Sequence, residues 1–231
     1  MFRLLYPQNV YYISKSFFSC IFLKKQKYDV TFYYPQHFNG LHGEAPFFSF
    51  LLDTCEKYNL KYLIIEEPDY LTSKPRNKKA LPFDFFWLLV IVLRKLLPQS
   101  LSFSDKENKI GHFLKKIWHL ESDSVITISC SFQGVFRGLC PDSKLFDYQH
   151  GILSKEFVSY HQEGAASSQI LKNKVEVLLY GKQVKEMLIN VNGGEYFKEK
   201  SHVLGVDVEY INRYTSFNKS ILLSLQISTS H

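Results

Sequence analysis

The segment DSVITISC, Asp123 to Cys130, decides how this chain folds. Its apolar and β-branched residues run on without the alternation of a half-exposed strand, and such a run is typical of a strand buried on both faces. A short helix, SFQGVFRGLCP, follows at 131–141 and ends at a proline, and SKLFDYQHG at 143–151 is the next strand. A strand, a helix and a second strand in this order predict a pair of parallel strands.

The same alternation extends in both directions from this unit. Hydrophobic spacing predicts strands at 28–34, 60–68, 175–181 and 201–206, and helices at 45–59, 82–98, 105–121 and 182–191. We therefore expect an α/β, Rossmann-like fold, with a mostly parallel sheet and helices on both faces. Such sheets bind ligands outside the carboxyl ends of their strands, so the loops that follow strands are where functional residues are expected.

The C-terminal segment has a different character from the rest of the chain. Residues 206–219 have the irregular composition of a linker, and ILLSLQIS at 221–228 has the apolar pattern of a strand. We expect residues 1–205 to form one Rossmann-like domain and 206–219 to be a linker. Residues 220–231 would then be the first strand of a truncated second domain.

The net charge limits the classes of partner, and the cysteine spacing indicates the cellular compartment. The 231-residue chain has a formal net charge of +6 and a pI near 9.0. This favours anionic partners such as nucleic acid, phosphorylated small molecules or an acidic membrane surface. The four cysteines have neither paired nor zinc-ligand spacing, so we expect no metal and a reducing, cytoplasmic compartment.

The most apolar segment is PFDFFWLLVIVLRKLLP at 82–98, whose uncharged core runs from 85 to 93. A helix needs about 20 apolar residues to cross a bilayer, so this segment is too short. Two interpretations remain open. The segment is a buried helix, or it lies on the inner face of the membrane with Arg94 and Lys95 at lipid phosphates.

The first candidate site is the loop PQHFNGLHGEAP, which follows a predicted strand and precedes a predicted helix. His42 or Glu44 is a candidate general base for a hydroxyl nucleophile. Asn39, Gly40 and Gly43 are candidate substrate contacts, because glycine lets the backbone turn tightly and approach a ligand. The alternative is a plain polar connection between strand and helix.

The second candidate site is the end of the strand SKLFDYQHG. His150 is a candidate acid, base or hydrogen-bond donor near neutral pH. Gln149, Gly151 and Lys155 are candidate substrate contacts beside it. The alternative is a structural histidine at the entrance of a loop.

Two further loops contain groups that could meet an anion, namely Arg137 and the basic stretch SKPRNKKA at 73–80. A solvated arginine and a solvated loop are the simpler interpretations. Glu66 and Glu67 have no partner that the sequence identifies. The chain has no P-loop, no dinucleotide-binding GxGxxG motif and no known nucleic-acid-binding module, so nucleic acid is not expected as a partner.

Several of these segments together resemble one family. FNGLHGEAPFFSFLLDTCEKYNLKYLIIEEPD, LFDYQHGI, VLLYGKQVKEML with HVLGV, and ILLSLQ are similar to the amino-terminal half of bacterial glycosyltransferases of the GT-B type. These enzymes act in the synthesis of surface polysaccharide, either lipopolysaccharide O-antigen or capsule. They have two Rossmann-like domains that face a cleft. The first holds the acceptor and often supplies the base, and the second holds most of the nucleotide-sugar.

The resemblance implies transfer of a sugar from a nucleotide-sugar to a lipid-linked or saccharide acceptor, with no cofactor. His42 or Glu44 would be the base, and His150 would contact the acceptor or the leaving phosphate. Because ILLSLQ would open the donor-binding domain, activity would require a separate donor-domain chain. Three alternatives stay open: a non-catalytic or partner-binding domain, a basic nucleic-acid-binding protein, and another enzyme on the same fold, such as a nucleotide-sugar epimerase.

Overall fold

The central element of the protein is a seven-stranded sheet in which every neighbouring pair of strands is parallel. The computed structural model describes residues 6–22, 26–151, 153, 160–162 and 164–205. The strand order is β3-β2-β1-β4-β5-β8-β9. The strands are β1 (Gln26–Pro35), β2 (Tyr62–Glu67), β3 (Leu81–Pro82), β4 (Leu120–Ile128), β5 (Lys144–Tyr148), β8 (Val175–Leu179) and β9 (Ser201–Val203), and a separate antiparallel pair comprises β6 (His161–Gln162) and β7 (Ala165–Ala166). The predicted α/β, Rossmann-like fold is confirmed.

The strand order reverses at the middle of the sheet. From β1 the chain builds outward to β2 and β3, and it then returns to place β4 on the other side of β1 and builds outward to β9. In open sheets of this kind, ligands bind in the crevice at the carboxyl ends of the two strands where the order reverses. Here that point lies between β1 and β4.

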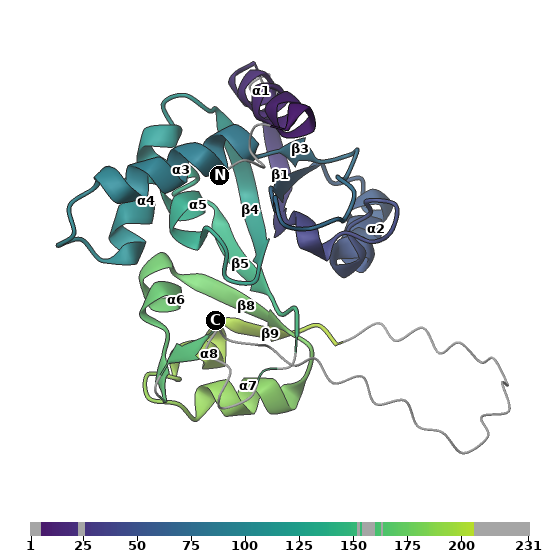
Figure 1. The fold of residues 1–231 in the computed structure, drawn as a ribbon. Helices are drawn as coiled ribbons and strands as arrows, with labels where there is room; N and C mark the ends of the chain where they lie inside the picture. Colours follow the sequence, from purple (N-terminus) through teal and green to yellow (C-terminus); the bar gives the residue numbers. More distant parts are fainter. Residues whose placement is uncertain (1–5, 23–25, 152, 154–159, 163, 206–231) are drawn as a thin grey trace, which may run out of the picture.

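Helices pack against both faces of the sheet, as Figure 1 shows with α2 on one side and α3, α4 and α5 on the other. The segment before α2 contains two short 3-10 turns. The elements are α1 (Pro7–Ile21), η2 (Gln36–Phe38), η3 (Pro46–Phe48), α2 (Ser49–Lys57), α3 (Asp84–Leu96), α4 (Phe103–Leu114), α5 (Gln133–Leu139), α6 (Ser168–Asn173), α7 (Lys182–Ile189) and α8 (Tyr196–Glu199).

The core has two layers because successive residues of a strand point to opposite faces. On β1, Tyr33 packs with Phe86 and Trp118 in the layer under α3 and α4. The preceding residue, Phe32, packs with Phe48 in the layer under α2. All five side chains are at most 1% exposed, and each buried Phe contributes roughly 1.5–3 kcal/mol to folding.

The N-terminal segment forms a helix that the sequence analysis did not assign. Pro7 occupies the first turn of α1, where its missing N–H and fixed φ are compatible with a helix. Ser16 accepts a hydrogen bond from the backbone N–H of Phe85 at 3.2 Å, and the rings of Phe17 and Phe85 lie 4.9 Å apart. Helix α1 is therefore anchored along the start of α3.

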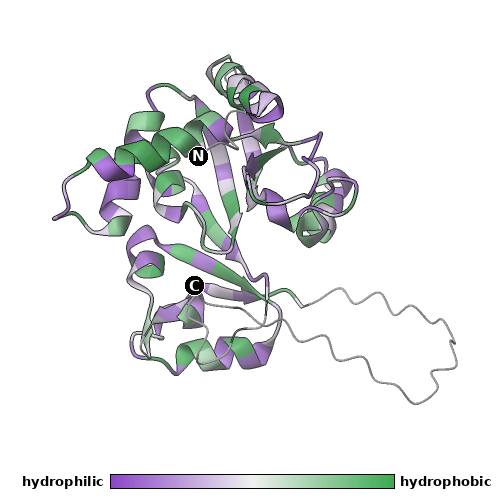
Figure 2. Cartoon of the chain, viewed as in Figure 1, coloured by the Kyte–Doolittle hydropathy of each residue, from purple (hydrophilic) through white to green (hydrophobic). Residues whose placement is uncertain are grey.

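Helix α3 is the apolar segment at 82–98, and Figure 2 shows it as predominantly hydrophobic. Within the described residues, no helix combines the length and hydropathy needed to cross a membrane. Arg94 forms an ion pair with Glu107 and lies over the rings of Phe103 and Phe132. The buried carboxylate of Glu107 therefore holds the Arg94 guanidinium, which favours the buried-helix interpretation of this segment.

The basic loop at 73–80 is also not simply solvated. Arg76 is buried and donates to Glu66 Oε1 at 3.0 Å and to Asp84 Oδ1 at 2.6 Å. Removing charges from water is favourable only when they are paired and hydrogen-bonded. This network therefore identifies the partner that the sequence did not reveal for Glu66, and it fixes the loop against the sheet.

Arg137 is similarly occupied. It is half-buried and donates to the backbone carbonyls of Asn173 at 2.8 Å, Pro141 at 3.0 Å and Ser143 at 2.9 Å. These bonds satisfy carbonyl groups at the end of α6 and in the loop between α5 and β5. Arg137 has a structural role here rather than that of a solvated side chain.

Candidate functional site

A histidine and a carboxylate meet at the carboxyl edge of the sheet, next to the point where the strand order reverses. His37 follows β1 and Asp69 follows β2, and His37 Nδ1 lies 2.9 Å from Asp69 Oδ2. The two side chains are 48% and 25% exposed. Gln36 holds the two loops together, since its Nε2 donates to the carbonyl of Lys74 and its Oε1 accepts from the N–H of Asp69.

This pair has the geometry of an oriented base. When Nδ1–H of His37 donates to Asp69, the lone pair of the imidazole resides on Nε2. His37 can therefore take a proton from a hydroxyl group placed beside it.

A second imidazole lies close by, at the end of β5. The ring of Phe38 lies 4.5 Å from the ring of His37 and 5.4 Å from that of His150. Burial lowers the pKa of His150, and the nearby His37 lowers it further. At neutral pH, His150 is therefore neutral and presents both a donor and an acceptor.

Glu67, the last residue of β2, joins the loops from the other side. Its carboxylate accepts hydrogen bonds from Tyr33 at 2.9 Å, Ser131 at 2.6 Å and Trp87 at 3.2 Å. Burial raises the pKa of Glu67, and the three donors oppose that rise. Because Ser131 lies in the loop after β4, Glu67 ties the ends of β2 and β4 together across β1.

The loop after β4 has an unusual backbone. Ser129, Cys130 and Phe132 have φ values of 66°, 54° and 53°, in the left-handed region that non-glycine residues rarely occupy. Asp147 of β5 stabilises this conformation by accepting from the N–H of Cys130 at 2.9 Å. Such strained residues cluster at functional sites, and this loop lies at the strand-order reversal.

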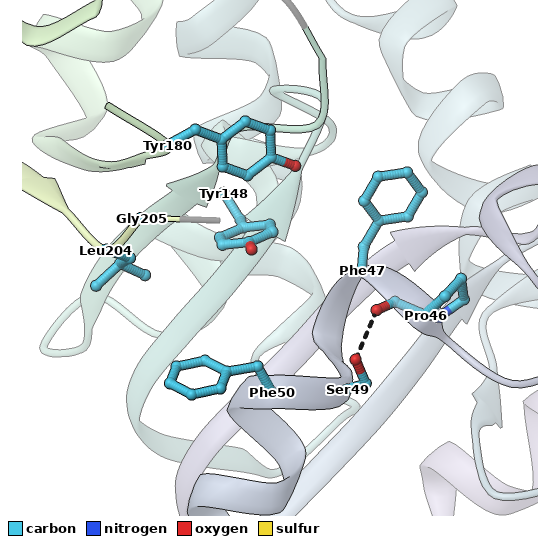
Figure 3. A pocket seen from close by; sticks show the side chains of 8 residues that line it. All are labelled: Pro46, Phe47, Ser49, Phe50, Tyr148, Tyr180, Leu204 and Gly205. Carbon is cyan, nitrogen blue, oxygen red and sulfur yellow. Dashed lines mark hydrogen bonds between the residues drawn. The ribbon is translucent and has the colours of Figure 1, made fainter. Parts of the chain in front are cut away.

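An aromatic groove adjoins the two histidines. It has a volume of about 470 Å³. Figure 3 shows one wall from η3 and the start of α2 and the opposite wall from the ends of β5, β8 and β9. The lining residues are Pro46, Phe47, Ser49, Phe50, Tyr148, Tyr180, Leu204 and Gly205. Phe47 contacts Phe38 with ring centroids 5.1 Å apart, so the groove begins next to the imidazole pair.

The predicted bases His42 and Glu44 lie in another hollow, of about 350 Å³, with Gly43, Lys78 and Lys79. Glu44 Oε2 accepts from the backbone N–H of His42 at 3.0 Å. Backbone hydrogen bonds from Glu44 itself and from His42 lower the pKa of Glu44. A carboxylate with a lowered pKa is a weaker base.

Three other residues of this loop that were predicted to contact substrate, Asn39, Gly40 and Gly43, determine the conformation of the loop. Asn39 is 2% exposed, and its Nδ2 donates to Glu66 Oε2 at 2.7 Å and to the carbonyl of Pro75 at 2.8 Å. A Cβ on Gly40 would lie 1.8 Å from the Glu44 carboxylate. Gly43 has a φ of +85°, and a Cβ there would lie 2.4 Å from the carbonyl oxygen of Arg76.

The residues predicted to contact substrate beside His150 are Gln149, Gly151 and Lys155. Gln149 is 2% exposed. Its Nε2 donates to the carbonyl of Gly151 at 2.7 Å and its Oε1 accepts from the N–H of Tyr180 at 2.9 Å. It therefore joins the ends of β5 and β8. Gly151 has no atom within 4 Å of an added Cβ. Lys155, like the expected linker at 206–219 and strand at 220–231, lies outside the described residues.

The described part of the chain contains no cluster of three or more His, Cys, Asp and Glu side chains that could hold a metal ion. Comparisons with protein-family models, with curated proteins and with solved structures produced no match.

Proposed function

We propose that this chain is the acceptor-side domain of a glycosyltransferase, and that His37 is the base that activates the acceptor. The observation that carries this proposal is the His37–Asp69 pair, which lies at the ends of β1 and β2, next to the strand-order reversal. A base is what sugar transfer to a hydroxyl requires from the acceptor side. The resemblance to GT-B glycosyltransferases of surface polysaccharide synthesis supports the choice of this reaction among those that use such a base.

In the proposed reaction, Nε2 of His37 removes the proton of an acceptor hydroxyl as its oxygen attacks the anomeric carbon of the donor. The bond between that carbon and the phosphate oxygen breaks, and the nucleotide leaves with the electron pair. The neutral imidazole of His150 would hydrogen-bond the acceptor. The nucleotide-sugar would be held by a donor-binding half, on a further domain or on a separate chain.

His37 replaces His42 and Glu44 as the proposed base for a physical reason. Asp69 binds the His37 ring directly, whereas the Glu44 carboxylate binds the backbone N–H of His42 and not its ring. Only the first arrangement fixes the tautomer of an imidazole.

The test measures nucleoside diphosphate release from UDP-, GDP- and dTDP-sugars in the presence of saccharide and lipid-linked acceptors. The chain is assayed alone and together with the product of the neighbouring reading frame. We expect H37N to lower the transfer rate by about 100-fold or more. The matched variant H42N should stay within about twofold of the unmodified chain. Equal rates for H37N and the unmodified chain would refute the assignment.

We also propose that the protein lies on an anionic membrane surface through α1. Tyr11, Phe18 and Phe22 are 58%, 56% and 72% exposed, and their spacing of seven and four places them on one face of the helix. Helix α1 contains Lys15 and no acidic residue. An aromatic face without negative charge, on a basic protein, suits the boundary between lipid headgroups and acyl chains.

Co-sedimentation with lipid vesicles tests this contact. Vesicles that contain phosphatidylglycerol should bind the protein more strongly than vesicles of phosphatidylcholine alone. The double variant F18S/F22S should bind at least about tenfold more weakly, because it removes two large apolar side chains from the contact. F50S changes an equally exposed phenylalanine on α2 and should bind like the unmodified chain. Equal binding by all three proteins would exclude α1 as the contact.

A further inference from the structure

None of the eight described residues that line the aromatic groove has a charged side chain. Its eight lining residues comprise four aromatic residues, with Pro46, Ser49, Leu204 and Gly205. A volume of about 470 Å³ falls within the range of small-molecule sites. A phosphate group is normally bound by arginine, lysine or several N–H donors. The lining therefore favours a neutral ligand over a nucleotide.

The rings are arranged on two opposed walls. Figure 3 shows Phe47 and Phe50 on the α2 side and Tyr148 and Tyr180 on the strand side. The two tyrosine rings meet edge to face, with centroids 5.7 Å apart and planes at 77°. Phe50 is 54% exposed, so its ring is available to a ligand without any rearrangement of the core.

The groove also offers directional polar groups. Burial raises the pKa of Tyr148, and it raises that of Tyr180 to about 12 with a smaller effect from Tyr148. Both hydroxyls therefore stay protonated and can donate as well as accept a hydrogen bond. A pocket with apolar faces and a few hydroxyl groups matches a molecule that has apolar faces and several hydroxyl groups.

A pyranose ring has that chemistry. Its C–H bonds carry a partial positive charge that the negative face of an aromatic ring attracts, and its hydroxyl groups point outward around the edge. We infer that the groove between Phe47, Phe50, Tyr148 and Tyr180 binds an uncharged sugar unit of a saccharide acceptor. This inference rests on the proposed function, and it adds the class of acceptor and the place where it is held.

The location agrees with that role. Phe47 contacts Phe38, and Phe38 contacts both His37 and His150. A sugar in the groove would therefore lie at the entrance to the imidazole pair. The groove would bind a unit of the acceptor, while the hydroxyl that reacts would reach His37.

Ligand-observed saturation-transfer NMR tests this site. The probes are the methyl glycosides of glucose, galactose and N-acetylglucosamine, and UMP serves as the phosphate-bearing probe. We expect signal transfer to the C–H protons of at least one glycoside. The variants F50A and Y180A should weaken its binding about fivefold or more, which corresponds to about 1 kcal/mol.

F18A is the matched control, because Phe18 on α1 is 56% exposed and Phe50 is 54% exposed. F18A should bind the glycoside like the unmodified chain, and circular dichroism on every variant shows that it is folded. The inference is overturned if no glycoside binds, if F50A and Y180A bind as well as F18A, or if UMP displaces the glycoside.

The variant H37N separates this inference from the proposed function. It should bind the glycoside with unchanged affinity, because His37 does not line the groove. If H37N retains both glycoside binding and an undiminished transfer rate, His37 is not the base, whereas the assignment of the groove as the sugar site is supported. Loss of glycoside binding in H37N would show that the sugar lies elsewhere.

Discussion

Two hollows flank the segment Pro46–Ser49, and they differ in every property that bears on function. The hollow on the β2 side contains His42, Glu44, Lys78 and Lys79. The groove on the β5 side is aromatic and uncharged and adjoins the His37–His150 pair. Titratable side chains that share a hollow need not be oriented by one another. The Glu44 carboxylate binds the backbone N–H of His42, whereas the ends of β1 and β2 bring the His37 ring within 2.9 Å of the Asp69 carboxylate.

The largest loss of stability is expected when Arg76 is replaced, in the loop that contributes Lys78 and Lys79 to the charged hollow. R76A would leave Glu66 and Asp84 buried without their guanidinium partner, and such a loss destabilises a protein by about 3–5 kcal/mol. K78A, in the same basic loop but exposed, should stay within about 0.5 kcal/mol of the unmodified chain. Urea unfolding monitored by circular dichroism measures both. Similar losses in the two variants would show that the Arg76 network does not stabilise the loop.

On the β5 side, the stability of the folded protein should depend on pH through Asp147. Burial raises the pKa of Asp147 to about 6, above its value of about 3.9 in an unfolded chain. At pH 7 the ionised carboxylate therefore destabilises the folded state. As the pH falls from about 6 to about 4 the folded protein takes up the proton first, and its stability rises by roughly 2–3 kcal/mol.

The measurement compares the unmodified chain with D147N by urea unfolding between pH 4.5 and 7.5. The asparagine does not titrate, so the unmodified chain should gain stability relative to D147N as the pH is lowered. A constant difference across this pH range would show that Asp147 has an ordinary pKa in the folded protein.

The smallest effects contrast two glycines that the sequence placed in candidate sites. G43A forces a non-glycine residue to a φ of +85° and against the Arg76 carbonyl, which we expect to destabilise the protein by about 1–3 kcal/mol. G151A meets open space and should change stability by less than about 0.5 kcal/mol. Thermal unfolding of the two variants provides the comparison. An effect of G151A as large as that of G43A would contradict the backbone roles described here.

The long strands of the sheet could be predicted from the sequence because the apolar pattern that marks a buried strand is local. Apolar runs such as Val125–Ile128 mark strands that are buried on both faces, and prolines mark where several of them end. Helix α1 escaped prediction because its aromatic pairs, Tyr11–Tyr12 and Phe17–Phe18, are poor helix formers. Its helical state depends on packing against α3, which is not a local property.

The imidazole–carboxylate pair could not be read from either loop alone. His37 and Asp69 are separated by 32 positions in the chain. Their contact follows from the register of β1 and β2, which places Pro35 opposite Glu67. His37 and Asp69 each lie two positions beyond that pair. Aligning the ends of adjacent predicted strands would have been the signal to use, since parallel strands end at the same edge of a sheet.

Phe38 has a consequence for the charge state of the site. Its ring contacts both imidazoles, which lie close enough for His37 to lower the pKa of His150. Once His37 has accepted a proton, a second proton on His150 is disfavoured by like-charge repulsion. A positive charge on His37 would therefore keep His150 neutral. In the proposed transfer reaction, the proton removed from each acceptor hydroxyl would have to pass to solvent before the next hydroxyl is activated.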